Sequence, residues 1–181
     1  MPSINTSTAL KSARDVQQFC NNLLTWLGNG LLTPPGLAIG NPVESYSANG
    51  NVRYTINGAQ YDDNSSRTST IFQDNTASVL NWVVTGANKF GACLVEIDDG
   101  TVGSGAMCRV SNMSQSYATA AEALAHLPAN DSNCPITYGA IVVQAKNATW
   151  TANTDDLTPG SDCVSVQYID KAVKQLPAAP L

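Results

Sequence analysis

The chain has little charge and few of the residues that usually carry out catalysis. Only 13% of its 181 residues are Asp, Glu, Lys or Arg, and His126 is the single histidine. The charged share is about half of that in typical globular proteins. The net charge is −5, and the nine basic residues are scattered. Because a nucleic-acid partner requires clustered Lys and Arg to neutralise phosphates, we expect none.

Long apolar runs and paired cysteine motifs are also missing. No run approaches the roughly 20 residues of a membrane span, and the start lacks a basic segment followed by an apolar one. We therefore expect no membrane partner and synthesis in a reducing cytoplasm. The five cysteines form no CxxC pair and are odd in number, which argues against a zinc site or a disulfide framework. No metal or cofactor is predicted.

Short uncharged polar residues take the place of the missing charges. Asn, Ser and Thr together make up 49 of the 181 residues. Their side chains compete with the backbone hydrogen bonds of helices, so this composition favours strands and turns. We expect a mainly β protein.

Residues 8–27 carry the one clear helical pattern. Apolar residues recur there at spacings of three or four: Ala9, Ala13, Val16, Cys20, Leu23 and Leu27. This is one stripe of an amphipathic helix, which "LTPPG" at residues 32–36 cannot continue. The stripe either packs on its own domain or meets copies of itself in an oligomer. In the second case its interface consists of Ala13, Val16, Cys20, Leu23 and Leu27.

The period of the apolar residues becomes two from Tyr46 onward. "VRYTINGAQYDD" at residues 52–63 predicts a hairpin with Asn57-Gly58 as its type I′ turn. This register places Tyr54 opposite Tyr61 and Arg53 opposite Asp62, which are both favourable cross-strand pairs.

A second hairpin is expected over residues 92–110, turning at Asp99-Gly100. Tight pairing sets Cys93 opposite Ala106, which leaves Cys108 as a diagonal neighbour about 7–8 Å away. That separation disfavours a disulfide unless a bulge intervenes.

Residues 116–127 predict a short helix, with Thr119 and Glu122 in capping-box spacing. Strands should follow over residues 136–145 and again near Val164–Tyr168. The predicted fold is an antiparallel β-sandwich or small barrel-like domain, preceded by an N-terminal amphipathic helix and interrupted by one short helix. It divides into a helical segment (1–30), a Pro/Gly linker (31–45), the β domain (46–170) and a tail (171–181).

No motif of a catalytic site accompanies the reactive residues. His126 ends the short predicted helix, where a C-cap role is expected. Cys134 precedes Pro135 and an apolar strand, so we expect it to be buried and inert. The acidic pairs at 62–63, 98–99 and 155–156 lack EF-hand spacing, and neighbours in a strand point to opposite faces. The sequence predicts no enzyme.

Several of these segments follow one another in a familiar order. "YTINGAQY", "CLVEIDDGTV", an Ala-rich segment, "LPANDSNCPITYGAIVVQ", "TDDLTPG" and "VSVQYI" resemble a group of tailed-phage virion structural proteins. In that group a sequence like "LP…CPIG" leads into a core strand. The matching residues here are Leu127, Pro128, Cys134, Pro135, Ile136 and Gly139, with Tyr138 placed before the glycine. The resemblance covers roughly residues 52–170 and excludes the N-terminal helix.

The resemblance implies a capsid decoration (cement) protein or a head-fibre component, usually trimeric. We therefore expect a homotrimer on the outer face of the phage head, bound to the major capsid protein and made in the host cytoplasm. The stripe would form the trimer or anchor it. The alternative is a receptor- or glycan-binding module of a tail or head fibre. There Trp150, in a polar stretch, is a better stacking candidate than Trp82, while Tyr117 is a further aromatic.

Overall fold

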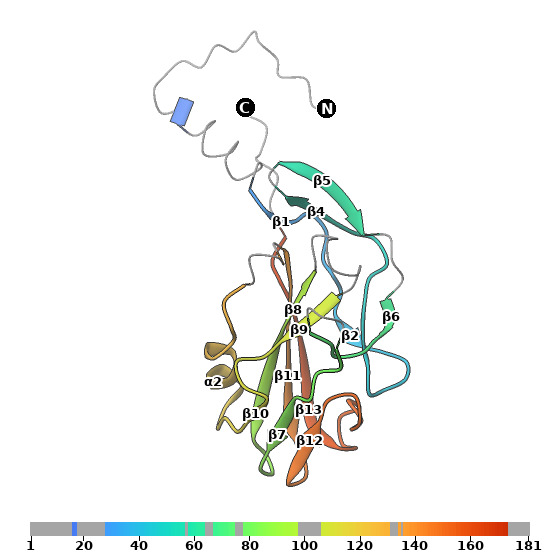
Figure 1. Cartoon of the computed structure of the whole chain (residues 1–181), viewed down its shortest axis with the longest axis vertical. Coiled ribbons are helices and arrows are strands. Elements are labelled where there is room, and N and C mark those ends of the chain that lie inside the picture. Colours follow the sequence, from blue (N-terminus) through green and yellow to red (C-terminus); the bar gives the residue numbers. More distant parts are fainter. Residues whose placement is uncertain are drawn as a thin grey trace.

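The computed structural model describes residues 16–17, 28–56, 58–63, 67–74, 78–97, 106–130, 134 and 136–173. Strands dominate these residues, and one six-residue helix is set among them (Figure 1). The elements are β1 (Gly30–Leu31), β2 (Ala38–Ile39), β3 (Tyr46–Ala48), β4 (Val52–Ile56), β5 (Ala59–Asp63), β6 (Arg67–Thr70), β7 (Val83–Thr85), β8 (Phe90–Ile97), β9 (Ala106–Arg109), β10 (Ser114–Gln115), α2 (Ala120–Ala125), β11 (Ile136–Ala145), β12 (Thr149–Thr151) and β13 (Cys163–Asp170). The mainly β prediction is confirmed.

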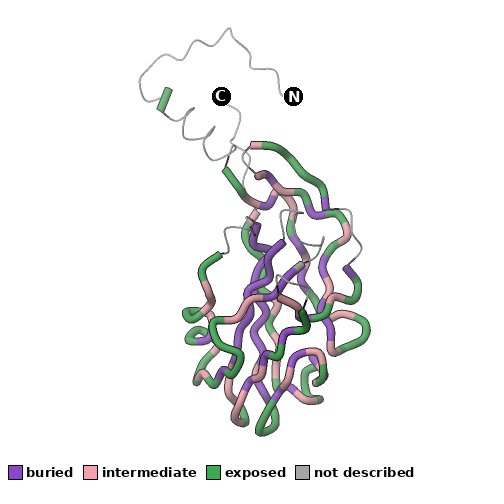
Figure 2. Tube along the Cα trace, in the orientation of Figure 1, coloured by how far each residue is buried: buried purple, intermediate pink, exposed green. Residues whose placement is uncertain are grey.

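The centre of the molecule is a four-stranded antiparallel sheet with the order β13-β11-β8-β9. Strand β11 has the predicted bounds, and nine of its ten residues are buried. A central strand whose two faces are both covered has a nearly continuous apolar sequence, and "ITYGAIVV" is such a sequence. Figure 2 shows this buried centre as the continuous purple part of the trace.

Three small sheets surround the centre, with the orders β1-β4-β5, β2-β3-β6 and β10-β7-β12. All of their strand pairs are antiparallel except β10 with β7. The β1-β4-β5 sheet lies at one end of the central sheet, and the β7 and β12 strands lie at the other (Figure 1).

The predicted hairpin at residues 52–63 is confirmed residue by residue. Tyr54 pairs with Tyr61 and Arg53 with Asp62. The two tyrosine rings stack with centroids 5.7 Å apart, and Arg53 forms an ion pair with Asp62 at 3.2 Å. Gly58 has a φ of +81°, as a type I′ turn requires.

Residues 31–45 belong to the β domain and do not form a separate linker, contrary to the domain division predicted above. Leu31 and Leu37 are part of the main hydrophobic core, and this segment contains β2. The carboxylate of Asp170 accepts hydrogen bonds from the backbone N–H groups of Gly36 and Leu37 at 3.1 and 2.9 Å. The chain beyond Pro34 and Pro35 is thus attached to β13.

The hairpin of β8 and β9 has a different register from the predicted one. Ala106 pairs with Ile97 instead of Cys93, and Val95 pairs with Cys108. This register does not fit the expected two-residue turn at Asp99-Gly100, and those two residues lie outside the part of the chain that the structure describes. Cys108 remains a diagonal neighbour of Cys93, and both are free thiols.

The short helix is α2, and its capping is the predicted one. Thr119 Oγ1 accepts a hydrogen bond from the Glu122 backbone N–H at 3.1 Å. Glu122 Oε2 accepts one in return from the Ala118 backbone N–H at 2.9 Å. In the part of the chain that the structure describes, no helix has the length and apolar character needed to cross a membrane.

Candidate interaction surface

The predicted N-terminal interface lies almost entirely outside the described residues. Ala13, Cys20, Leu23 and Leu27 fall outside them. Val16 is described: it is helical and 44% exposed. Exposure of an apolar residue on the stripe is what either an oligomer contact or an anchoring contact requires.

Trp150 is not available for stacking on a sugar, so this part of the glycan hypothesis is wrong. Trp150 lies in β12, and its side chain is fully buried. The side chain of Trp82, directly before β7, is fully buried as well. The two indole rings meet edge to face with centroids 5.1 Å apart, and Phe72 lies against both. The polar residues around Trp150 in the sequence indicated exposure, but strand alternation turns the indole inward while its neighbours face outward.

A buried ion pair connects the small sheets to the central sheet. Asp63, at the end of β5, and Arg67, at the start of β6, are both about nine-tenths buried, and their charged groups lie 2.9 Å apart. The hydroxyl of Tyr138 donates a hydrogen bond to Asp63 Oδ2 at 2.8 Å. The pKa of Tyr138 is raised by burial and by this carboxylate. A buried charge pair of this kind requires such added hydrogen bonds to offset its desolvation.

A β-bulge in β11 aims Tyr138 at this ion pair. Thr137 pairs with Glu96 and Gly139 with Val95, so Tyr138 is an extra residue opposite β8. The next residue must be glycine, because a Cβ on Gly139 would lie 2.0 Å from the backbone oxygen of Ile169. The glycine in "YG" is a sequence signal for a bulge, but the sequence does not show that Tyr138 reaches Asp63.

A second ion pair lies across the β8–β9 hairpin. Glu96 is fully buried and contacts Arg109 at 3.2 Å, and Arg109 also donates to the Ala129 carbonyl at 2.9 Å. Arg109 borders an open surface hollow of about 150 Å³. The hollow is lined by Asp74, Leu80, Cys108, Arg109, Val110 and Met113. Arg109 is thus already engaged in holding β9 and the segment after α2.

His126 is the C-cap of α2, as expected. Its Nδ1 lies 2.8 Å from the Glu122 carbonyl oxygen, and its ring stacks on Tyr117 with centroids 4.7 Å apart. Tyr117, named above among the aromatic candidates for sugar stacking, has one ring face against this histidine. Both rings therefore contribute to packing α2 on the domain.

The acidic residues near β12 shape a turn. Asp155 Oδ2 accepts a hydrogen bond from the Thr151 backbone N–H at 2.6 Å, and Asp156 Oδ1 accepts one from Thr158. The hydrogen bonds from Thr158 lower the pKa of Asp156. Among the residues described, no three His, Cys, Asp or Glu side chains come close enough together to hold a metal ion.

The four cysteines of the described residues are buried. Cys134 is among them, as its place before β11 predicted. Burial raises the pKa of Cys93 well above the usual value, and the neighbouring Cys108 thiol adds to this. Burial also raises the pKa of Cys163 to about 11. Cys93 and Cys163 therefore stay protonated at neutral pH, and all four side chains pack as small apolar groups.

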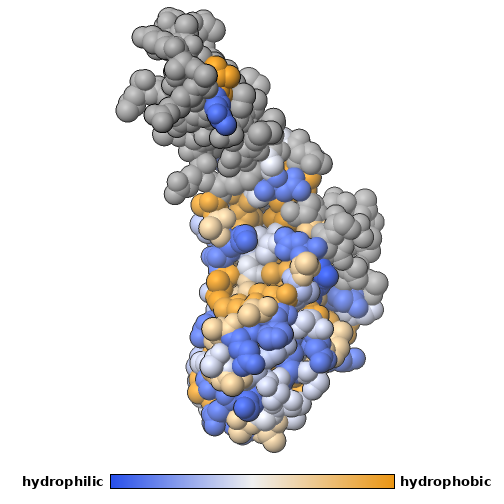
Figure 3. Space-filling model, turned by 90° about the vertical axis from the view of Figure 1, so that its left-hand side faces the viewer, coloured by the Kyte–Doolittle hydropathy of each residue, from blue (hydrophilic) through white to orange (hydrophobic). Residues whose placement is uncertain are grey.

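The β1-β4-β5 sheet is the part of the described surface that is best built for contact with another chain. Strand β1 follows directly on the predicted N-terminal helix, and four of the five residues of β5 are exposed. Figure 3 shows a surface on which hydrophobic and hydrophilic residues are mixed, as expected for a chain with few charges. Tyr61 of β5 is 46% exposed, although its other side stacks on Tyr54.

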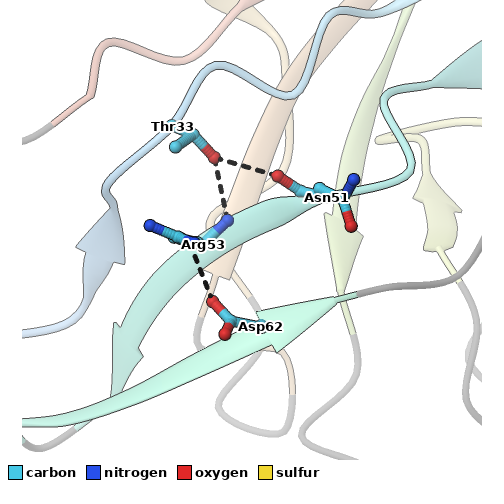
Figure 4. Close-up of polar contacts among 4 residues, drawn as sticks. All are labelled: Thr33, Asn51, Arg53 and Asp62. Atoms are coloured by element: carbon cyan, nitrogen blue, oxygen red, sulfur yellow. Dashed lines mark hydrogen bonds and ion pairs between the residues drawn. The ribbon is translucent and has the colours of Figure 1, made fainter.

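The edge of β4 that faces away from β5 pairs with β1, and Leu32 and Thr33 continue this contact beyond the end of β1. The backbone N–H of Arg53 donates to Thr33 Oγ1 at 2.8 Å (Figure 4). The Arg53 carbonyl accepts from the Leu32 N–H at 2.7 Å. Thr33 Oγ1 in turn donates to the Asn51 carbonyl at 3.4 Å. One threonine thus takes the place of a further strand residue, and both backbone groups of Arg53 face away from β5.

No protein-family model, no curated protein and no solved structure matches this chain. The function must therefore be inferred from the residues of this chain and from their arrangement.

Proposed function

We propose that the chain is a decoration (cement) protein of a tailed-phage head, which binds the outer face of the major capsid protein as a homotrimer. The observation that carries the proposal is the order of segments that resembles tailed-phage virion proteins, from "YTINGAQY" to "VSVQYI". In this proposal the sheets form a sandwich that faces outward, and the protein is a component of the virion surface.

The arrangement of those segments supports the proposal. The hairpin of residues 52–63, which contains "YTINGAQY", meets the "CPITYGAIVVQ" strand through a direct hydrogen bond. This bond joins Asp63 to Tyr138, 75 residues later in the chain. Most charged side chains described above hold backbone groups or one another, as Asp63, Glu96, Asp155 and Asp170 do. A rigid domain of this kind stabilises a shell by binding the assembled form and not its dissociated subunits.

The N-terminal stripe provides the contact that makes the protein trimeric or anchors it. Replacing Leu23 and Leu27 with Asp places charges on the stripe, where a trimer contact would bury them without partners. We expect the double variant to be monomeric in sedimentation velocity, with an unchanged far-ultraviolet spectrum of the β domain. Trimers that survive unchanged would show that the stripe is not the trimer contact, and would leave it the anchoring role.

The number of copies per particle tests the proposal itself. Quantitative mass spectrometry of purified virions should give this chain in a simple ratio to the major capsid protein. A few copies per particle would instead indicate a fibre component, the alternative function, and absence from the particle would overturn the virion assignment. The fibre alternative has lost Trp150 as its sugar-binding residue.

A further inference from the structure

The outer edge of β5 is open in the part of the chain that the structure describes. Strand β5 pairs with β4 on one side, and no described strand pairs with the other. The side chains of Ala59, Gln60, Tyr61 and Asp62 are all exposed. Proteins usually protect such an edge with lysine, proline or a bulge, because its free backbone groups attract another strand. β5 contains no lysine, proline or bulge, and its one exposed charge, Asp62, is paired with Arg53.

The register of the hairpin shows which backbone groups face outward. In an antiparallel ladder, residues opposite each other point their backbone groups either both inward or both outward. Arg53 points its groups away from β5, to Thr33 and Leu32. Asp62, directly opposite Arg53, therefore points its own groups away from β4. Gln60, two residues along the strand, does the same.

Gln60 and Asp62 are spaced to pair with each other across a two-fold axis. If two copies of β5 run antiparallel with the axis at Tyr61, Gln60 of each copy lies opposite Asp62 of the other. This register forms four backbone hydrogen bonds and places no carboxylate opposite a carboxylate. An axis at Asp62 would oppose the two Asp62 side chains, which is unfavourable. The Asp62 charge is already neutralised by Arg53 at 3.2 Å.

The same register continues the aromatic stack between the two copies. Tyr61 of each copy would form a non-hydrogen-bonded pair, in which side chains approach most closely. The 46% of Tyr61 that is exposed beside Tyr54 would then be covered by the other Tyr61. The pairs Tyr54–Tyr61 of the two copies would form one row of four rings.

We propose that β5 is a self-association edge, which joins two copies of this chain in an antiparallel pair about a two-fold axis at Tyr61. The proposal does not depend on the capsid assignment, and it is distinct from the trimer contact of the N-terminal stripe. Five residues span only about 17 Å, so the contact is small beside standard interfaces of about 1,200–2,000 Å². It is a weak contact, suited to joining oligomers that are already close to one another.

Cysteine cross-linking of the full-length chain tests both the contact and its register. In a Cys20→Ser background, Tyr61→Cys should form disulfide dimers under mild oxidation at least about tenfold faster than Gln60→Cys or Asp62→Cys, because identical residues at 60 or 62 are too far apart to be bridged. The rate should rise with protein concentration. Cross-linking of Tyr61→Cys that is no faster than in either control would overturn the proposal.

A proline at Gln60 provides the second test. Gln60→Pro removes one outward N–H group and leaves the ladder with β4 intact, because that N–H is not part of it. Added to Tyr61→Cys, it should reduce the cross-linking rate at least about tenfold, while Gln60→Thr, which keeps the N–H, should not. An unchanged rate with Gln60→Pro would contradict edge pairing. Cross-linking should persist with Leu23→Asp and Leu27→Asp, and its loss there would assign the contact to the N-terminal stripe.

Discussion

The central sheet and the β1-β4-β5 sheet use antiparallel strands in opposite surroundings. Strand β11 is buried along nearly its whole length, whereas β5 exposes four residues of five. The two surroundings meet at the end of β5: the Arg67–Asp63 pair is buried there and accepts a hydrogen bond from Tyr138 of β11, whereas the Arg53–Asp62 pair, one residue earlier, is exposed. The same kind of ion pair is therefore buried at one position of β5 and exposed at the neighbouring position.

The difference teaches that environment decides what a contact contributes. An exposed ion pair is screened by water and contributes little to stability, while breaking a buried pair leaves a charge without its counterion. Substitutions that treat the two regions alike should therefore give unequal results.

The largest effect is expected at the buried ion pair. Arg67→Met leaves the Asp63 carboxylate in the core without its cation, which should lower the free energy of unfolding by about 3–5 kcal/mol. The matched control is Arg53→Met, which removes the exposed partner of Asp62 and should cost no more than about 1 kcal/mol. Urea unfolding of both variants measures this. Equal losses would show that burial does not distinguish the two pairs.

A methyl group at the bulge should be nearly as harmful. In Gly139→Ala the new Cβ would meet the Ile169 backbone oxygen at 2.0 Å, so strands β11 and β13 must move apart. We expect a loss of about 3 kcal/mol. Gly160→Ala is the control, because a Cβ there meets nothing within 4 Å and only the positive φ of +93° opposes it. Its cost should be about 1–2 kcal/mol. A thermal midpoint for Gly139→Ala at or above that of Gly160→Ala would contradict the close approach.

Alkaline pH should weaken the core around Cys163. The pKa of Cys163 is about 11 in the folded chain and 9.0 for an ordinary thiol. Between these values the unfolded chain loses the proton and the folded chain keeps it, so stability falls as pH rises from about 9 to 11. One such group contributes about 1.4 kcal/mol per pH unit. Urea midpoints should therefore decline over this window, less steeply in Cys163→Ala; identical slopes would exclude Cys163 as a cause.

The smallest effect is expected at the cap of α2. Thr119→Ala removes the hydroxyl that accepts from the Glu122 N–H, and should cost about 1 kcal/mol. Thr119→Ser keeps the acceptor and serves as the control. Hydrogen exchange of the Glu122 amide reports the loss directly, and equal protection in both variants would argue against the cap.

Local signals made much of the fold predictable from the sequence. Asn57-Gly58 fixed the register of the 52–63 hairpin, and the apolar run after Pro135 gave the bounds of β11. Features that depend on distant segments were not predictable in this way. The burial of Trp150 requires Phe72 and Trp82, and the attachment of residues 36–37 requires Asp170, more than 130 residues away.

The candidate surface shows the same division. Sequence periodicity predicted the Tyr54–Tyr61 and Arg53–Asp62 pairs, which are local to one hairpin. It did not predict that β1 and Thr33 cover one edge of β4 while no described strand covers the outer edge of β5, because this depends on how the chain before the hairpin returns to it. The predicted register of β8 with β9 was also wrong: Asp99-Gly100 favoured Cys93 opposite Ala106, whereas Ala106 pairs with Ile97.

The bulge at Tyr138 also has an evolutionary consequence. Its one extra residue sends a tyrosine out of the central sheet to an aspartate that would otherwise be costly to bury. The inserted tyrosine, the glycine after it, and the aspartate and arginine of two other sheets thus depend on one another for their burial. We expect descendants of this sequence to keep all four or to lose them together, and a lineage that deleted the tyrosine to have replaced the buried ion pair with apolar side chains.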